Sequence, residues 1–162
     1  MYDQDCMYCA ENEHLQSLML PVCEVDGFRL YLFRDQTYPG RCIVAFRDHK
    51  RKLSELTVGE TADYFACIRR VAQMLDELFH PEQVNIAMFG DKVRHLHCHL
   101  VPKYVGGTDF GGMFQMSPAP AKLLTQPEYE AIIASMTPAC PRSLPPRWKL
   151  EALLMSTFSL LI

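Results

Sequence analysis

The chain lacks a surplus of charge of either sign and lacks an apolar run long enough to cross a bilayer. Its 162 residues carry a formal net charge of −3, which gives no global reason to expect nucleic acid or an anionic membrane as a partner. The first ten residues, MYDQDCMYCA, are acidic and lack the apolar core of a signal peptide. The apolar stretch 150–162 is too short for a membrane span. We therefore expect a soluble, cytoplasmic protein.

The cysteine count is odd, which argues against a closed framework of disulfides. Seven cysteines without a secretory signal are typical of a reducing compartment. With 49% hydrophobic and 22% charged residues, the composition is that of an ordinary globular domain. We expect one domain over 1–138 and a tail of unknown role over 139–162, which begins with closely spaced prolines and ends in apolar residues.

Short strands and two helices account for most of the pattern. Asp26-Gly27 separates two apolar stretches and predicts a tight hairpin. Thr57 and Glu60 form a capping box before residues with helical spacing, and Pro81 ends that helix. A second box at Thr125 opens a short helix to about residue 137. Strands are expected at 21–25, 28–35, 41–46, 84–89 and 95–101. The class is α+β: a five-stranded antiparallel sheet with one long and one short helix.

Three of the six histidines fall within five positions of the sequence HLHCHLV, residues 95–101. His95, His97 and His99 alternate with apolar residues, so a strand would direct all three rings to one face. They do not form a three-histidine metal centre, because the first and last backbones are roughly 13 Å apart along a strand. A metal–nitrogen bond is only about 2.0 Å long. At most two of the three rings can share one metal.

A row of imidazoles suits phosphate chemistry. A neutral ring can attack phosphorus, and a neighbouring ring can stabilise charge and deliver a proton to the departing group. The alternative is a set of half-buried histidines with structural hydrogen bonds, which is less probable for strict alternation than for one histidine. Lys92, Arg94 and Lys103 bracket the strand. They would suit a phosphate-bearing molecule, or they are solvated residues at strand ends. The glycine-rich stretch 106–114 is either a loop over a site or a plain surface loop.

These residues resemble the histidine triad family. HLHCHLV matches the family's His-φ-His-φ-His-φ-φ pattern, and VPK continues it. YPGRCIVAFRDH resembles the preceding strand, while FHPEQVNIAMFGDKVRHLH and DFGGMFQMSP resemble the diadenosine tetraphosphate hydrolase-like branch. The likeness covers roughly residues 4–137. It implies a small domain that dimerises through a shared sheet and processes nucleotides at the α-phosphate.

The resemblance also implies roles for single residues. His97, the middle histidine, corresponds to the nucleophile, and His99 to the residue that contacts the phosphate and leaving group. Asp91 precedes the triad where relatives often have Asn and is expected to bond near the phosphate. Asp35 matches a position near the ribose hydroxyls.

Two arginines depart from the family pattern. Arg41 stands where many relatives have histidine, and Arg94 replaces a proline before the triad. An arginine near the site would bind an additional phosphate as a fixed cation. The alternative is a solvent-facing strand residue.

The spacing C-x-x-C at Cys6 and Cys9 is by itself equally typical of a redox motif. Relatives with an N-terminal C-x-x-C complete a zinc site with two histidines, which correspond here to His49 and His95. The resemblance therefore implies one structural zinc per chain. Alternatively, the cysteines are free in a frayed terminus. His14 lies close in sequence but is expected at the surface.

The function expected from these observations is hydrolysis of a purine nucleotide. The substrate would be a dinucleoside polyphosphate or a nucleoside phosphoramidate, cleaved through a nucleotidyl intermediate on His97. A nucleotidyl transferase or phosphorylase would use the same residues with another acceptor. A non-catalytic nucleotide-binding module would bind AMP without turnover. We expect a homodimer, with no nucleic acid or membrane partner.

Overall fold

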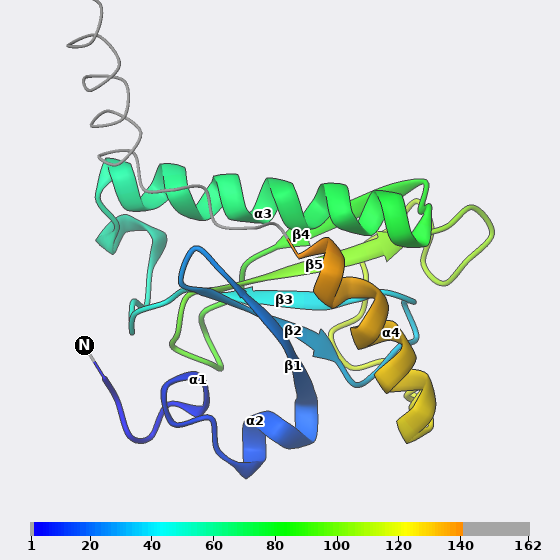
Figure 1. Ribbon diagram of the computed structural model, residues 1–162, viewed down its shortest axis with the longest axis horizontal. Helices are drawn as coiled ribbons and strands as arrows, with labels where there is room; N and C mark the ends of the chain where they lie inside the picture. Colours follow the sequence, from blue (N-terminus) through cyan, green and yellow to red (C-terminus); the bar gives the residue numbers. More distant parts are fainter. Residues whose placement is uncertain (1, 141–162) are drawn as a thin grey trace, which may run out of the picture.

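Five antiparallel strands form the sheet of the computed structural model, which describes residues 2–140 (Figure 1). The sheet has the order β1-β2-β3-β5-β4, so β3 and β5 lie at its centre and β4 forms one edge. All neighbouring pairs are antiparallel, as predicted. The strands are β1 (Met19–Val25), β2 (Phe28–Phe33), β3 (Cys42–Ala45), β4 (Gln83–Ala87) and β5 (His97–Lys103).

Both predicted helices form, and both begin at their capping boxes. In α3 (Val58–Phe79), Thr57 and Glu60 exchange backbone and side-chain hydrogen bonds. The helix ends at His80, which adopts the left-handed conformation just before Pro81. The second helix is α4 (Gln126–Ala139), with its box at Thr125. The sequence did not predict the short α1 (Met7–Ala10), α2 (Glu13–Leu18) or the single 3₁₀ turn η1 (Leu53–Glu55).

Helices cover the two faces of the sheet differently. Figure 1 shows α3 on one side of the sheet and α1 and α2 on the other, while α4 packs into the same core as α3. The α3 side contains the larger apolar core, which includes Cys98 and Leu100 of β5. On the opposite face, Tyr8 and Leu15 pack on Ile43 of β3 in a smaller apolar cluster. Because successive strand residues point to opposite faces, His97 and His99 lie on the face covered by α1 and α2.

The pairing of β3 with β5 sets the neighbours of the two histidines. Ala45 is opposite His97, and Ile43 is opposite His99. Strand β5 begins at His97 rather than at position 95 as predicted. The preceding Leu96 hydrogen-bonds through its main chain to Lys50 and Phe46 instead of continuing the ladder. His95 therefore lies outside the β5 ladder.

One disulfide differs from the expectation for the cysteines. Cys23 of β1 is bonded to Cys140 at the end of α4, across 117 residues of sequence. The other five cysteines, Cys6, Cys9, Cys42, Cys67 and Cys98, are free. The bond joins the end of α4 to the edge strand β1. Within residues 2–140, no helix combines the length and apolarity needed to cross a membrane. Residues 141–162, which make up most of the predicted tail, lie outside the described residues.

Candidate functional site

A main-chain carbonyl fixes the proton of His97. The Nδ1 atom of this ring lies 2.6 Å from the carbonyl oxygen of His95. A carbonyl can only accept a hydrogen bond, so Nδ1 carries the proton and donates it. Burial lowers the pKa of His97, with the bond to His95 acting in the opposite direction. The ring is therefore neutral near pH 7, and Nε2 holds an available lone pair.

His99 is buried without hydrogen-bond partners. Its side chain is 2% exposed, and neither ring nitrogen bonds to another of the described residues. Buried polar groups are nearly always paired, and an unpaired one costs about 1–3 kcal/mol. Aromatic rings of Phe33, Phe89 and Phe114 surround it at centroid distances of 6.3, 6.0 and 6.3 Å. A polar ring held in this way indicates a site for a ligand.

The rings of His97 and His99 are neighbours, with centroids 5.1 Å apart. Burial lowers the pKa of His99 to about 3, and the charges of His97 and Arg41 add to this effect. Both rings can therefore face a phosphate group in the neutral form, one with a fixed lone pair and one with two unpaired nitrogens. This is the arrangement that nucleophilic and acid–base chemistry on phosphorus requires.

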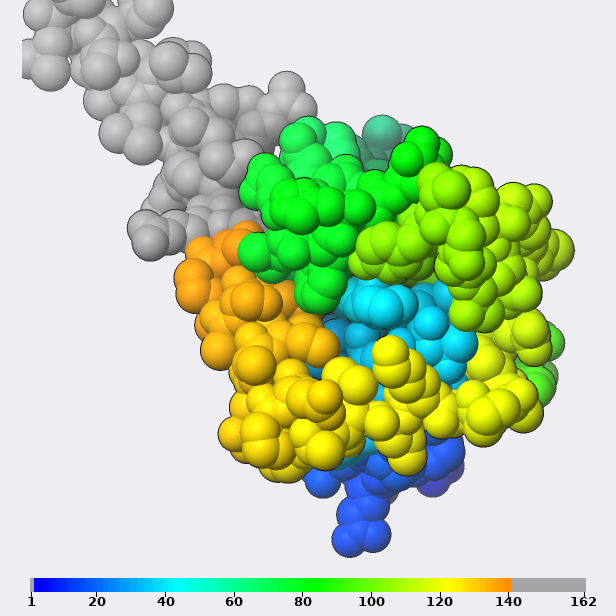
Figure 2. Space-filling view, turned by 90° about the vertical axis from the view of Figure 1, so that its right-hand side faces the viewer, coloured from blue at the N-terminus to red at the C-terminus, as the bar shows by residue number. Residues whose placement is uncertain are grey.

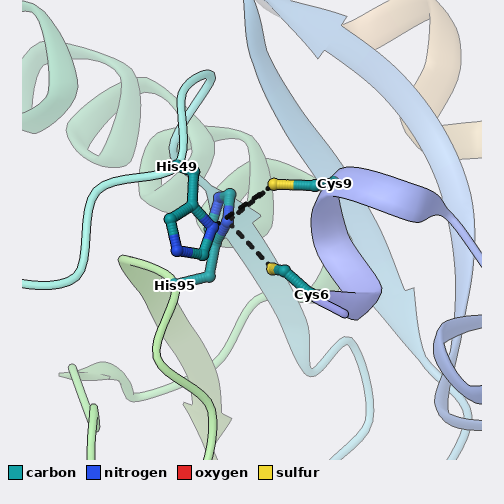
Figure 3. A group of neighbouring side chains, drawn as sticks. All are labelled: Cys6, Cys9, His49 and His95. Atoms are coloured by element: carbon teal, nitrogen blue, oxygen red, sulfur yellow. Dashed lines mark hydrogen bonds between the residues drawn. The ribbon is translucent and has the colours of Figure 1, made fainter. Parts of the chain in front are cut away.

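A second cluster lies at the other end of the histidine sequence. Cys6 immediately precedes α1 and Cys9 lies within it, while His49 follows β3 and His95 precedes β5. Figure 3 shows the four side chains converging from these segments. Their ligand atoms all lie within 4.8 Å of one another. The cysteine sulfurs are 3.4 Å (Cys6) and 3.7 Å (Cys9) from Nδ1 of His95, and Cys9 is 3.4 Å from Nδ1 of His49.

These distances suit a tetrahedral metal ion. Bonds of about 2.3 Å to sulfur and 2.0–2.1 Å to nitrogen put sulfur and nitrogen ligands roughly 3.5 Å apart in a tetrahedron. The histidines present the correct atoms. Nε2 of His95 lies 2.9 Å from the carbonyl oxygen of Phe46, so Nε2 carries the proton and Nδ1 is free to bind metal. Nε2 of His49 is 3.4 Å from the carboxylate of Asp3, which is long for a hydrogen bond but within ion-pair range. Outer partners of this kind orient metal-binding histidines.

Tyr8 connects the two clusters. It lies between Cys6 and Cys9 in sequence, and its ring is 1% exposed. Its centroid is 5.0 Å from that of His95 and 5.2 Å from that of His97. The metal cluster and the central histidine therefore share one packed ring. Sequence analysis missed this residue, because a tyrosine within C-x-x-C carries no signal for a contact with residues 95–97.

Comparison with known proteins identifies the family. The family model described as the HIT domain matches residues 21–106, more than half of the chain. The chain belongs to the HIT domain family. Among curated relatives, bis(5'-adenosyl)-triphosphatase of Saccharomyces cerevisiae is 31% identical over 67 residues, covering 38% of this chain and 32% of the yeast protein. This chain thus matches only about a third of that relative's length.

Solved HIT structures share the fold. A histidine triad protein from Bradyrhizobium japonicum aligns with a TM-score of 0.72 at 17% identity, covering 80% of this chain and 96% of that one. A zinc-bound histidine triad family protein from Mycobacterium smegmatis aligns with a TM-score of 0.60 at 21% identity, covering 85% and 94%. The HIT fold predicted from the sequence is confirmed.

Two carboxylates expected in this HIT site do not contact the triad. Oδ1 of Asp35 accepts hydrogen bonds from the backbone nitrogens of Thr37 and Lys122, both at 3.0 Å, and from the Thr37 hydroxyl at 2.7 Å. It holds a turn to the segment before α4. Asp91 is exposed in the turn between β4 and β5, and it forms no hydrogen bond with another residue of 2–140. Their expected contacts with a nucleotide stay predictions.

The basic residues near the histidine strand of this HIT domain lie in different surroundings. Lys103 is buried and donates to the carbonyls of Thr108 and Asp109 in the glycine-rich stretch. Lys92 and Arg94 line a small cavity beside Cys6 together with the exposed His14. Arg41 is the largest fully buried side chain and is not solvent-facing.

The low pKa of His99 predicts an acid-sensitive fold. Below pH 6.5 the unfolded chain takes up a proton at this position, whereas the folded chain does so only near pH 3, so folding stability falls as the pH decreases through that window. The maximum slope for one proton is about 1.4 kcal/mol per pH unit. We expect His99→Asn to flatten the dependence of the melting temperature on pH between 7 and 4.5.

His14→Asn is the matched control, since it makes the same change at an exposed ring. It is expected to leave the slope of the wild type unchanged. Equal slopes for wild type and His99→Asn would show that His99 takes up its proton alike in the folded and unfolded chains.

Proposed function

We propose that this chain hydrolyses dinucleoside polyphosphates or nucleoside phosphoramidates at the α-phosphate, through a nucleotidyl intermediate on His97. Membership of the HIT family supports nucleotide processing in general. The observation that carries the specific proposal is the hydrogen bond from Nδ1 of His97 to the His95 carbonyl. It leaves Nε2 unprotonated and directed away from the backbone, as a nucleophile needs.

In the first step, the Nε2 lone pair attacks the α-phosphorus and forms a P–N bond. The bond from phosphorus to the leaving group breaks, and its electron pair departs with a leaving oxygen, or with a leaving nitrogen that takes up a proton relayed from solvent by His99. The ring of His97 becomes cationic, and its Nδ1–H bond to the His95 carbonyl becomes charge-assisted and therefore stronger. The carbonyl therefore stabilises the transition state, in which this charge develops, more than the neutral ring of the free enzyme, which is the condition for catalysis.

In the second step, a water oxygen attacks the same phosphorus. The P–N bond breaks, its electron pair returns to Nε2, and the water proton is lost to His99 or solvent. The product is a nucleoside monophosphate. His99, with both nitrogens unpaired, lies beside His97 and serves as the group that holds the phosphate and transfers protons to the leaving group.

A purine nucleotide is the proposed substrate class. The three phenylalanine rings around His99 offer aromatic surfaces for a base next to the phosphate position. Phe89 and Phe114 also line an open cleft of about 370 Å³ over β4. The yeast relative is named for hydrolysis of a diadenosine polyphosphate, which supports the adenine dinucleotide among the candidates.

We also propose that Cys6, Cys9, His49 and His95 hold one structural zinc ion. Two thiolates and two imidazoles are a preferred donor set for zinc, and four protein ligands leave no open position. The zinc-bound relative from Mycobacterium smegmatis supports this choice of metal. A bound ion would link the segment of Cys6 and Cys9 to the start of β5. It would thereby hold Tyr8 against His97 and support the proposed nucleophile by position.

The proposal extends to assembly and location. β4 is an edge strand with exposed Ile86 and Phe89 nearby, and an edge of this kind suits pairing with a second copy in a homodimer. In the proposed cytoplasmic location, Cys23 and Cys140 would be thiols, because glutathione and thioredoxin keep cysteines reduced there.

Turnover assays test the catalytic role of His97. We expect the wild type to release AMP from diadenosine tetraphosphate or adenosine phosphoramidate, and His97→Ala to lower kcat by roughly 10³-fold or more while still binding AMP. His14→Ala, a histidine change on the surface, serves as control and should retain full activity. A wild type that binds AMP but turns over neither substrate would exclude the hydrolase and leave transfer or binding alone.

Elemental analysis tests the metal proposal. Protein purified without chelators is expected to contain about one zinc per chain, as closed structural sites do, and Cys9→Ser should lose most of it. Cys67→Ser is the matched control: Cys67 is a buried cysteine on α3 that faces the larger core, and this variant should keep its zinc. Equal zinc in both variants, or no zinc in the wild type, would contradict the proposed ligands.

A further inference from the structure

Arg41 extends the row of histidines on the neighbouring strand. It immediately precedes Cys42, the first residue of β3, which pairs with Leu100. By alternation, Arg41 points to the same face as Ile43, which is opposite His99. Its positive charge contributes to the low pKa of His99. On the sheet face covered by α1 and α2, Arg41 therefore lies beyond His99, on the side away from His97.

The arginine is buried, and it forms no salt bridge with a carboxylate of the described residues. Its residue exposure is 0%, and its Nε has no hydrogen-bond partner among residues 2–140. The nearby Asp35 carboxylate affects its pKa, but the described structure records no salt bridge between them. Burial lowers the pKa of Arg41 to about 10, which still leaves it charged at neutral pH. A buried cation that is not paired is costly unless a ligand supplies the anion.

The other contacts of the guanidinium are weak and replaceable. It lies 4.1 Å from the centre of the Phe33 ring and 5.5 Å from that of Phe114. Its NH1 donates to the Met116 carbonyl at 3.2 Å, and its NH2 approaches the Met116 sulfur at 3.8 Å. Phe33 and Phe114 also contact His99. Arg41 and His99 thus share the same aromatic walls, and each has a nitrogen without a partner.

A segment after β5 covers this position. Figure 2 shows the lime-to-yellow chain that follows β5 framing the cyan turn between β2 and β3. Tyr38 in that turn donates to the Asp109 carboxylate at 2.5 Å and accepts from the backbone of Gln115 at 2.8 Å. This segment contacts the guanidinium through the Phe114 ring, the Met116 carbonyl and the Met116 thioether, and none of these groups carries a charge. A phosphate oxygen that displaced the Met116 carbonyl would make a stronger, charge-assisted bond.

From this arrangement we infer that Arg41 binds the phosphate next to the one attacked by His97, and so selects polyphosphate leaving groups over amines. The inference rests on the proposed function and specifies its substrate class. When the bond from phosphorus to the bridging oxygen breaks, the electron pair and negative charge pass to the leaving phosphate chain. A fixed guanidinium at that chain neutralises the charge, whereas a leaving amine has no anion for it to bind.

The test compares two substrates that share the α-phosphate. For Arg41→Gln we expect kcat/KM to fall by about 100-fold with diadenosine tetraphosphate and by less than about threefold with adenosine phosphoramidate. Arg41→Lys should lose less with the polyphosphate, because it keeps the charge without the planar fork. Arg69→Gln, an exposed arginine on α3, is the matched control and should change neither value. Equal losses on both substrates would overturn the inference.

Nucleotide-binding measurements test the role of Arg41 independently of turnover. Arg41→Gln should weaken ATP binding by at least about tenfold and leave AMP binding unchanged, whether or not the wild type hydrolyses either substrate. If the variants do not fold, the Nε–H resonance of Arg41 in the wild type provides the measurement. It should shift when ATP is added and not when AMP is added. The same response to both nucleotides would refute the role of Arg41, while absent turnover with an ATP-specific response would refute only hydrolysis.

Discussion

Two hydrogen bonds to main-chain carbonyls determine what the histidines can do. The Phe46 carbonyl accepts a hydrogen bond from Nε2–H of His95, and the His95 carbonyl accepts one from Nδ1–H of His97. Two residues apart on the chain, the rings are therefore opposite tautomers. One presents Nδ1 to a pair of cysteines, and the other keeps Nε2 for chemistry. Without these carbonyls, nothing in the intrinsic pKa of the two imidazoles would favour one tautomer in His95 and the other in His97.

Side-chain packing connects the Cys6–Cys9–His49–His95 cluster with His97. The segment with Cys6, Tyr8 and Cys9 covers the histidine face of the sheet, and Tyr8 contacts both His95 and His97. A short helix of four residues has little stability by itself, so α1 depends on its apolar contacts and on any metal held by its cysteines. The position of His97, the proposed nucleophile, thus depends on a segment almost ninety residues earlier in the chain.

The sequence predicted those features that depend on local patterns. The five strands, both capping boxes and the grouping of Cys6 and Cys9 with His49 and His95 follow from alternation, Thr–Glu spacing and a family motif. Short α1 and α2 were missed, because four to six residues are too few to display a helical period. The pair Cys23–Cys140 was missed, because connectivity across 117 residues has no local signal.

For Arg41 the sequence left two interpretations open, an arginine for phosphate or a solvent-facing residue. Burial decides against the second, and only the register of β3 with β5 shows that the side chain adjoins His99. Asp35 was expected near a ribose, yet its Oδ1 is engaged by backbone amides around Thr37 and Lys122. Such competition between a ligand and local backbone donors is invisible until the loops are placed.

The stereochemical course at the α-phosphorus tests the central claim most directly. A diadenosine polyphosphate made chiral at that phosphorus by sulfur and oxygen isotopes would be hydrolysed by the wild type, and the configuration of the released thiophosphate determined. Attack by His97 followed by attack by water inverts the phosphorus twice, so the account predicts overall retention. Inversion would mean that water attacks directly, and it would contradict the nucleotidyl-His97 intermediate.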